Sequence, residues 1–169
     1  MRLLIVESPC KTIEKYLGGD FVVRASVGHV RDLPKSNKKA VDIENDFKPH
    51  YEISKGKEHI VEELSELAEK ADEVYLATDP DREGEAIAWH IAQAIHLKKP
   101  KRITFNEITK EAVQEALEHP RSVDIQLKEA QEARRLLDVY RPLHCVFSWN
   151  ASGKSAPSYQ KNFLYFLRR

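Results

Sequence analysis

The feature that most constrains this chain is a short apolar stretch that ends abruptly in a run of acidic residues. Residues 74–77 have the length and composition of a buried β-strand, which Pro80 stops. Asp79, Asp81 and Glu83 follow at alternate positions. In extended backbone such residues share one side, so three carboxylates would gather at a strand end. A cation would relieve their repulsion, and hard oxygen ligands of this kind suit Mg²⁺.

The same run has a second interpretation. Glu83 and Glu85 also suit the first turn of a helix, where the helix dipole favours negative charge. That explanation leaves out Asp79 and Asp81, which stand at a strand end, where open α/β sheets place their ligands. We therefore favour metal binding by this run over simple helix-start chemistry.

A second acidic candidate closes the first apolar stretch of the chain. Glu7 follows residues 3–6, and a carboxylate beside a metal site is a candidate general acid or base. Ser8 and Pro9 form a helix-start signal, because Ser caps free amides and Pro suits the first helical position. Lys11 then falls in the first turn, where the dipole disfavours a cation unless a phosphate is bound. We interpret Lys11 as either a phosphate ligand or a solvated surface residue.

The hydrophobic pattern alternates between the two secondary-structure periods. It predicts helices at 12–17, 57–70, 83–95, 110–118 and 125–137, and strands at 3–6, 21–25, 74–77 and 103–105, with a weaker strand at 51–53. Such alternation predicts an α/β fold with a mostly parallel sheet covered by helices. Residues 34–50, rich in Lys, Asn, Asp and Pro, are expected to form an exposed excursion between sheet elements.

Composition sets limits on the class of protein. A chain of 169 residues with 41% hydrophobic and 32% charged residues is ordinary for a globular domain with a sizeable core. Zero net charge gives no electrostatic footprint for nucleic acid, so such a role must rest on motifs. Cys10 and Cys145 have no zinc-type spacing and suggest no disulfide framework. No stretch is long and apolar enough for a membrane span, and we expect a cytoplasmic protein.

Seven segments carry a resemblance to a known family. They lie, in the family's order, at 6–9, 25–34, 42–47, 78–85, 88–90, 102–109 and 133–138. Together they resemble the amino-terminal Toprim domain of bacterial type IA DNA topoisomerase I and cover residues 1–138 almost continuously. A Toprim domain alone would leave primases and several nucleases open. The segments at 102–109 and 133–138 narrow the resemblance to topoisomerase I.

The resemblance implies a Toprim, Rossmann-like fold over residues 1–120, with residues 121–138 as the first helix of the next topoisomerase domain. It also implies the role of each candidate site residue. These are Mg²⁺ binding by Glu7, Asp79, Asp81 and Glu83, catalysis by Glu7, Lys11 and Arg102, and DNA binding by His29, Arg134 and Asp138, with both arginines on DNA phosphates. The first loop departs from the family pattern, because it is two residues shorter and two family lysines compete for the position of Lys11.

The function implied is ATP-independent relaxation of supercoiled DNA by single-strand cleavage and religation. This chain would supply the Mg²⁺-binding and acid/base half of the site, while the catalytic tyrosine comes from a later domain. The implied partners are a single-stranded segment of supercoiled DNA and the missing topoisomerase domains, in the cytoplasm and at the nucleoid. Two alternatives stay open: a free-standing Toprim nuclease that uses the same metal to activate water, and a catalytically silent DNA-binding fragment.

The resemblance stops after Asp138. Residues 139–169 contain none of the 27 acidic residues and seven of the 14 aromatic residues, so composition changes at the same point. We expect this tail not to be a native continuation, as a shifted reading frame or a truncated gene would produce. We also expect that the chain alone does not relax DNA. None of Tyr140, Tyr159 and Tyr165 has the context of the family's nucleophile.

Overall fold

The chain divides into two units in a computed structural model that describes residues 1–8, 11–34, 40–42 and 48–147, the last nine as backbone alone. The first unit comprises Met1–Asp32 and Ile53–Gln131. The second comprises Leu33–Glu52 and Glu132–Arg169. Of the tail predicted at 139–169, residues 148–169 lie outside the described residues. The same holds for residues 35–39 and 43–47 of the predicted excursion.

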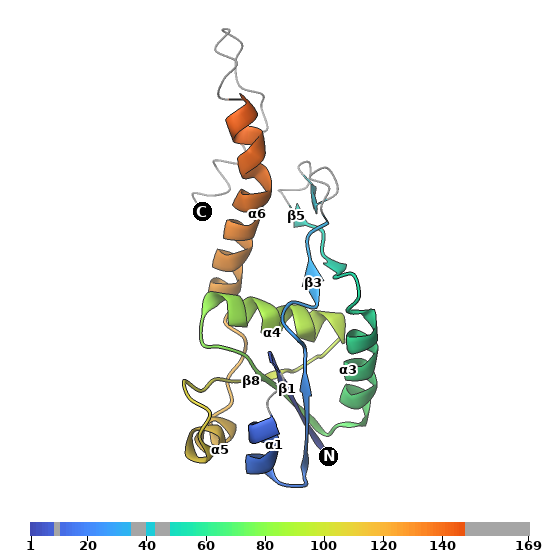
Figure 1. Ribbon diagram of the computed structural model, residues 1–169, viewed down its shortest axis with the longest axis vertical. Coiled ribbons are helices and arrows are strands. Elements are labelled where there is room, and N and C mark those ends of the chain that lie inside the picture. Colours follow the sequence, from blue (N-terminus) through green and yellow to red (C-terminus); the bar gives the residue numbers. More distant parts are fainter. Residues whose placement is uncertain (9–10, 35–39, 43–47, 148–169) are drawn as a thin grey trace. The chain divides into compact units, whose positions relative to one another are not determined.

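The first unit is built on a sheet of four parallel strands (Figure 1). Their order across the sheet is β2 (Phe21–Ala25), β1 (Arg2–Val6), β7 (Glu73–Ala77) and β8 (Lys101–Ile103). The two central strands read as nearly continuous apolar runs, as expected for parallel strands that are buried on both faces. The predicted α/β class with a mostly parallel, helix-covered sheet is confirmed.

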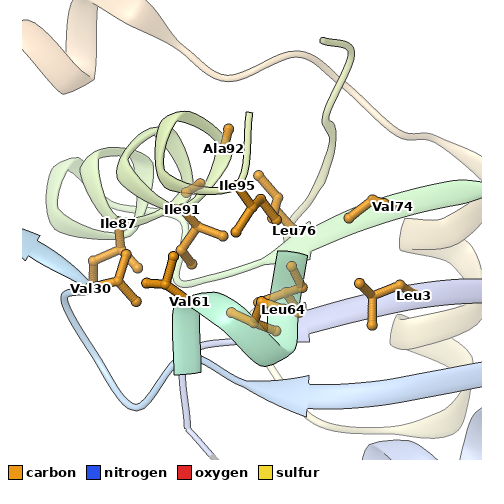
Figure 2. Packing of buried hydrophobic residues seen from close by; sticks show 12 residues of the cluster. Leu3, Val30, Val61, Leu64, Val74, Leu76, Ile87, Ile91, Ala92 and Ile95 are labelled. Carbon is orange, nitrogen blue, oxygen red and sulfur yellow. The ribbon is translucent and has the colours of Figure 1, made fainter. Parts of the chain in front are cut away.

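Helices α3 (Glu58–Lys70) and α4 (Arg82–Ala94) cover one face of this sheet. Figure 2 shows their side chains meeting the strand residues that point to this face, with Leu64 of α3 beside Leu3 of β1, and Ile91 of α4 near Leu76 of β7. The apolar side chains that recur every three to four residues along these helices, such as Ile87 and Ile91 of α4, therefore lie in the core.

Helices α1 (Lys11–Leu17) and α5 (Lys110–Glu118) cover the opposite face. There Ile13 and Val113 pack with Leu4 and Val6, the β1 residues that alternate with those facing α3 and α4. This alternation follows from the two-residue period of a strand, and it gives the sheet a hydrophobic layer on each side.

The second unit contains a two-stranded antiparallel sheet and part of a long helix. The sheet pairs β4 (Val41–Asp42) with β5 (Lys48–Pro49). Its small cluster is formed by Leu33, Ala40, Val41 and Leu136, with Tyr51 packed against it. The helix is α6 (Ile125–Phe147), which enters this unit at Glu132. Of two further short strands, β3 (Arg31–Asp32) belongs to the first unit, and β6 (Glu52–Ile53) spans the position where the chain passes from the second unit to the first.

Several predicted boundaries were wrong for identifiable reasons. Helix α6 continues ten residues past the predicted end at 137, because no Gly or Pro interrupts residues 125–141, and it then runs through Pro142 to Phe147. Strand β8 begins at Lys101 rather than at 103, because its first two residues are charged and masked the strand pattern. The 34–50 segment contains β4 and β5, with Ala40 and Val41 buried, so it is not wholly exposed. Pro9, the predicted helix start, lies outside the described residues.

No helix within the described residues is both long and apolar enough to cross a membrane.

Candidate functional site

The candidate site lies at the carboxyl edge of the parallel sheet. Val6 of β1 is paired in register with Ala77 of β7, so these strands end level with each other. Glu7 and Thr78 are therefore the first residues beyond two adjacent strand ends. The chain order of the sheet reverses at β1, which has β2 on one side and β7 on the other. Open α/β sheets bind their ligands at such a reversal point.

The loop that joins β7 to α4 is closed tightly on the first turn of the helix. The buried hydroxyl of Thr78 donates to the Gly84 carbonyl at 2.6 Å. The Gly84 amide donates to Asp81 Oδ1 at 2.7 Å, which makes Asp81 the N-cap of α4. A Cβ atom at Gly84 would lie 2.1 Å from the Asp79 carbonyl oxygen. Only glycine fits this approach of two backbone segments.

The acidic side chains of this edge share one electrostatic environment. Asp79, Asp81 and Glu83 are exposed, whereas Glu7 is half-buried. Burial raises the pKa of Glu7, and repulsion by the three other carboxylates, that of Asp79 most, raises it further. His29 opposes the shift in the pKa of Glu7. The Nε2 atom of His29 lies 3.0 Å from Glu83 Oε1.

These carboxylates are near one another without forming a metal cage. Among the described residues, no group of three or more His, Cys, Asp or Glu side chains is placed to hold a metal ion. Asp81 caps α4, a helix-start role that the sequence interpretation had considered only for Glu83 and Glu85. The donors nevertheless fit Mg²⁺ in chemical type. Burial is the first cause of the raised pKa of Glu7, and the second is the negative charge of the neighbouring carboxylates, which a cation would relieve. Metal binding stays a prediction.

The loop after β2 brings His29 to this edge. Val27 has a φ of 56°, a left-handed conformation that costs a β-branched residue about 1–2 kcal/mol. Two bonds hold the loop in place. The Gly28 amide donates to the Glu7 carbonyl at 3.2 Å, and Lys57 Nζ donates to the Val27 carbonyl at 2.6 Å. The strained loop therefore ties the end of β1 to the segment that carries His29.

The structure places Arg102 inside the protein. Its side chain is fully buried, with Nη2 donating to the Asp79 carbonyl at 2.8 Å. Nη1 donates to the carbonyls of Leu76, at 3.2 Å, and Ile103. Nε lies 3.3 Å from Glu85 Oε1 in an ion pair. Because burial and these internal acceptors occupy the guanidinium, the geometry favours a structural role. The predicted role on DNA phosphate stays a prediction.

Glu85 is the residue whose importance the sequence interpretation missed. Its side chain is fully buried, and its carboxylate accepts from Arg121 Nη2 at 2.5 Å and from the Asp124 amide at 2.9 Å. The sequence interpretation gave Glu85 only a first-turn helix role. One signal for burial was available, because Ala88 and Ala92 follow at three and seven positions and are buried on the same face.

The other predicted residues lie on helix surfaces. Lys11 is the exposed first residue of α1. Arg134 and Asp138 are exposed on α6, four residues apart and so on one face of the helix, in the part that belongs to the second unit. Their catalytic and DNA-binding roles stay predictions.

Comparison with known proteins agrees with this architecture. Residues 2–108 match the family model of the Toprim domain. The chain is also similar to full-length topoisomerase I from Thermotoga maritima, with 50% sequence identity and a TM-score of 0.76. That match covers 81% of this chain and 24% of the Thermotoga chain, so this chain spans only a fraction of its relative's length. The parallel sheet and the family match over more than half of the sequence show that this chain belongs to the Toprim-domain family.

Proposed function

We propose that this chain supplies the carboxylate and divalent-cation part of the active site of a type IA DNA topoisomerase. The observation that carries the proposal is the 50% identity to Thermotoga maritima topoisomerase I over 81% of this chain. The carboxylates that follow β1 and β7, which are Glu7 and those of residues 79–83, are the groups that could hold a divalent cation. Strand cleavage and religation would require the further domains of a longer protein, with DNA as the substrate, in the cytoplasm and at the nucleoid.

Asp79, Asp81, Glu83 and Glu7 are the residues that would hold the metal. A bound Mg²⁺ would stabilise negative charge on a phosphoryl group during its transfer. Asp81 can keep one oxygen on the Gly84 amide, because each carboxylate has two oxygens and several acceptor sites. Affinity should be modest without DNA, since Mg²⁺ retains several waters and takes substrate phosphates as ligands.

Glu7 is proposed as the general acid and base. Burial is the largest cause of the raised pKa of Glu7, and a cation that offsets the charge of the neighbouring carboxylates would leave that cause in place. A carboxyl group with a pKa raised by burial keeps its proton at higher pH than usual, which suits donation to the leaving oxygen of a phosphodiester. Lys11 and His29 would contact the DNA near this carboxyl group. Arg134 and Asp138 would bind the DNA strand from one face of α6.

A chimera tests the proposal directly. The region of the Thermotoga maritima enzyme that matches this chain would be replaced by the corresponding residues of this chain. We expect Mg²⁺-dependent relaxation of negatively supercoiled plasmid. Glu7→Ala in the chimera should lower the rate by about 10²- to 10⁴-fold, the usual contribution of a general acid or base. Glu14→Ala, which removes an exposed carboxylate of α1, serves as the matched control and should relax DNA at the chimera's rate.

Other outcomes would refute the role of Glu7 or favour one of the two alternative functions. Normal relaxation by the Glu7→Ala chimera would refute the role of Glu7. Mg²⁺-dependent cutting of plasmid by the isolated chain would favour the nuclease alternative. DNA binding by the isolated chain, together with an inactive chimera, would favour the catalytically silent alternative.

A further inference from the structure

Glu85 connects three segments of the first unit. The residue itself lies in the first turn of α4. It follows the segment that leads from β7 into α4 and carries Asp79, Asp81 and Glu83, which we call the acidic loop. Its carboxylate pairs with Arg102 of β8 at 3.3 Å and with Arg121 at 2.5 Å, and it accepts the Asp124 amide at 2.9 Å. The side chains of Glu85 and Arg102 are both fully buried, whereas that of Arg121 is 41% exposed.

Arg102 in turn contacts the main chain of the acidic loop. Nη2 of Arg102 donates to the main-chain carbonyl of Asp79 at 2.8 Å. Gly84 lies against the same carbonyl group, at a distance that leaves no room for a Cβ atom. The Asp79 backbone is therefore held by a guanidinium and limited by the helix backbone at Gly84. Arg102 Nε makes no hydrogen bond to any described residue, so its 3.3 Å contact with Glu85 is a charge pair. The planar guanidinium can face Glu85 with Nε and Asp79 with Nη2 only in one orientation.

Stability alone is a weak reason for this arrangement. A buried ion pair contributes little net stability, because the cost of removing two charges from water offsets their attraction, and well-packed apolar residues often serve equally well. Polar partners behind a metal ligand, in contrast, commonly set the ligand's orientation. The position of this ion pair, directly under the acidic loop, matches the second role.

We propose that Glu85 is a positioning residue for the acidic loop. Its carboxylate orients Arg102, and Arg102 fixes the Asp79 main chain, so that the carboxylates of the run leave β7 in one arrangement. This inference rests on the proposed function for its metal readout, because it assigns the acidic loop to Mg²⁺. It also makes a prediction about the loop itself that holds without metal.

The first test measures Mg²⁺ affinity of the full chain by titration calorimetry in the absence of DNA. Glu85→Gln should bind Mg²⁺ about 10- to 100-fold more weakly than wild type, the usual effect of losing a partner behind a metal ligand. Arg121→Gln is the matched control, since it removes an ion pair from the same carboxylate but leaves Arg102 paired. Its affinity should stay within about twofold of wild type.

A second variant covers the case in which Glu85→Gln fails to fold. Arg102→Lys keeps a positive charge opposite Glu85 but cannot pair with it and reach the Asp79 carbonyl together. It should also bind Mg²⁺ about 10-fold more weakly or worse. A direct DNA contact by Arg102 would not change Mg²⁺ affinity measured without DNA. Folded Glu85→Gln and Arg102→Lys proteins with wild-type Mg²⁺ affinity would overturn the positioning role.

The second test follows amide hydrogen exchange of residues 78–85 in metal-free protein. Exchange there should be at least about 10-fold faster in Arg102→Lys than in wild type, and unchanged in Arg121→Gln, because only the first variant loses the bond to Asp79. Unchanged exchange in Arg102→Lys would overturn the positioning role whatever the metal does. Faster exchange in a chain whose wild type binds no Mg²⁺ would support the positioning role and refute the proposed metal site.

Discussion

At the scale of the single residue, Gly84 is where two backbone segments of the site meet with no room for a Cβ atom. The backbone of Asp79 lies against this glycine, and Thr78 and Asp81 hold the carbonyl and amide of the same residue. An added methyl group would have to displace main-chain atoms, which cannot rotate away as a side chain can. The requirement for glycine thus comes from packing, since the conformation of Gly84 is that of an ordinary helix residue.

We therefore expect Gly84→Ala to lower the free energy of unfolding by about 2 kcal/mol or more, at the upper end of overpacking costs. Gly19→Ala is the matched control, because a Cβ atom built there has no described atom within 4 Å and its φ is outside the left-handed range. It should change the free energy of unfolding by less than about 0.5 kcal/mol. Urea denaturation measures both. Equal unfolding midpoints for the two variants would show that the loop yields to the methyl group.

At the scale of the element, α4 combines the start of the site with a buried titratable group. Asp81 caps its first turn, and its middle carries His90, whose side chain is only 4% exposed. The ring of His90 lies edge-on to Trp89, with 4.9 Å between ring centroids. Burial, with smaller contributions from Arg31 and other nearby cations, lowers the pKa of His90 from its ordinary value of 6.5 to about 3. The folded helix therefore holds a neutral imidazole.

This depressed pKa predicts a specific dependence of stability on pH. The unfolded chain takes up a proton on His90 below pH 6.5, whereas the folded chain does so only near pH 3. The free energy of unfolding should therefore fall as pH drops through this window, by up to about 1.4 kcal/mol per pH unit from this group. His90→Gln removes the group, so stability should fall less steeply between pH 6.5 and pH 4. Parallel curves for the two proteins, measured by urea denaturation, would contradict the prediction.

At the scale of the whole molecule, the candidate site residues of the first unit gather at one edge of the parallel sheet, whereas its hydrophobic core forms a layer on each face of that sheet. The two hydrophobic clusters lie on opposite faces of the sheet and contain none of the candidate site residues. The acidic groups at the carboxyl edge repel one another in the absence of a cation, and this repulsion, after burial, contributes to the raised pKa of Glu7. A cation that binds only the folded chain should therefore stabilise the whole molecule.

The expected effect is a rise in melting temperature with Mg²⁺. At a concentration ten times Kd, binding should add about 1.4 kcal/mol, or about 3–6 °C for a chain of this size. The double variant Asp79→Asn with Asp81→Asn should lose this rise, although asparagine still caps a helix well. Sodium chloride at matched ionic strength controls for screening, and a chelator should reverse the effect. The same rise in wild type and double variant would rule out this loop as the binding site.

Local sequence signals by themselves determined the order of the main helices and of the four parallel strands, but not the short strands β3, β4 and β5. Periodicity located α3, α4 and α5, and for α5 both ends were predicted. In the structure the Thr109 side chain caps the first turn of α5. The apolar stretch before residue 78 was correctly predicted as a strand with its acidic run at the carboxyl end. These features depend on neighbours within a few residues, which is why one sequence sufficed for them.

Only the tertiary structure decided what the charged side chains do. Arg102 was predicted to bind DNA phosphate, and Glu85 was given only a place in the first turn of a helix, yet the structure buries both side chains completely and pairs them. The bond from Arg102 to Asp79 spans 23 positions, and that from Arg121 to Glu85 spans 36. A charged residue is buried only where distant partners satisfy it, and no local pattern encodes those partners.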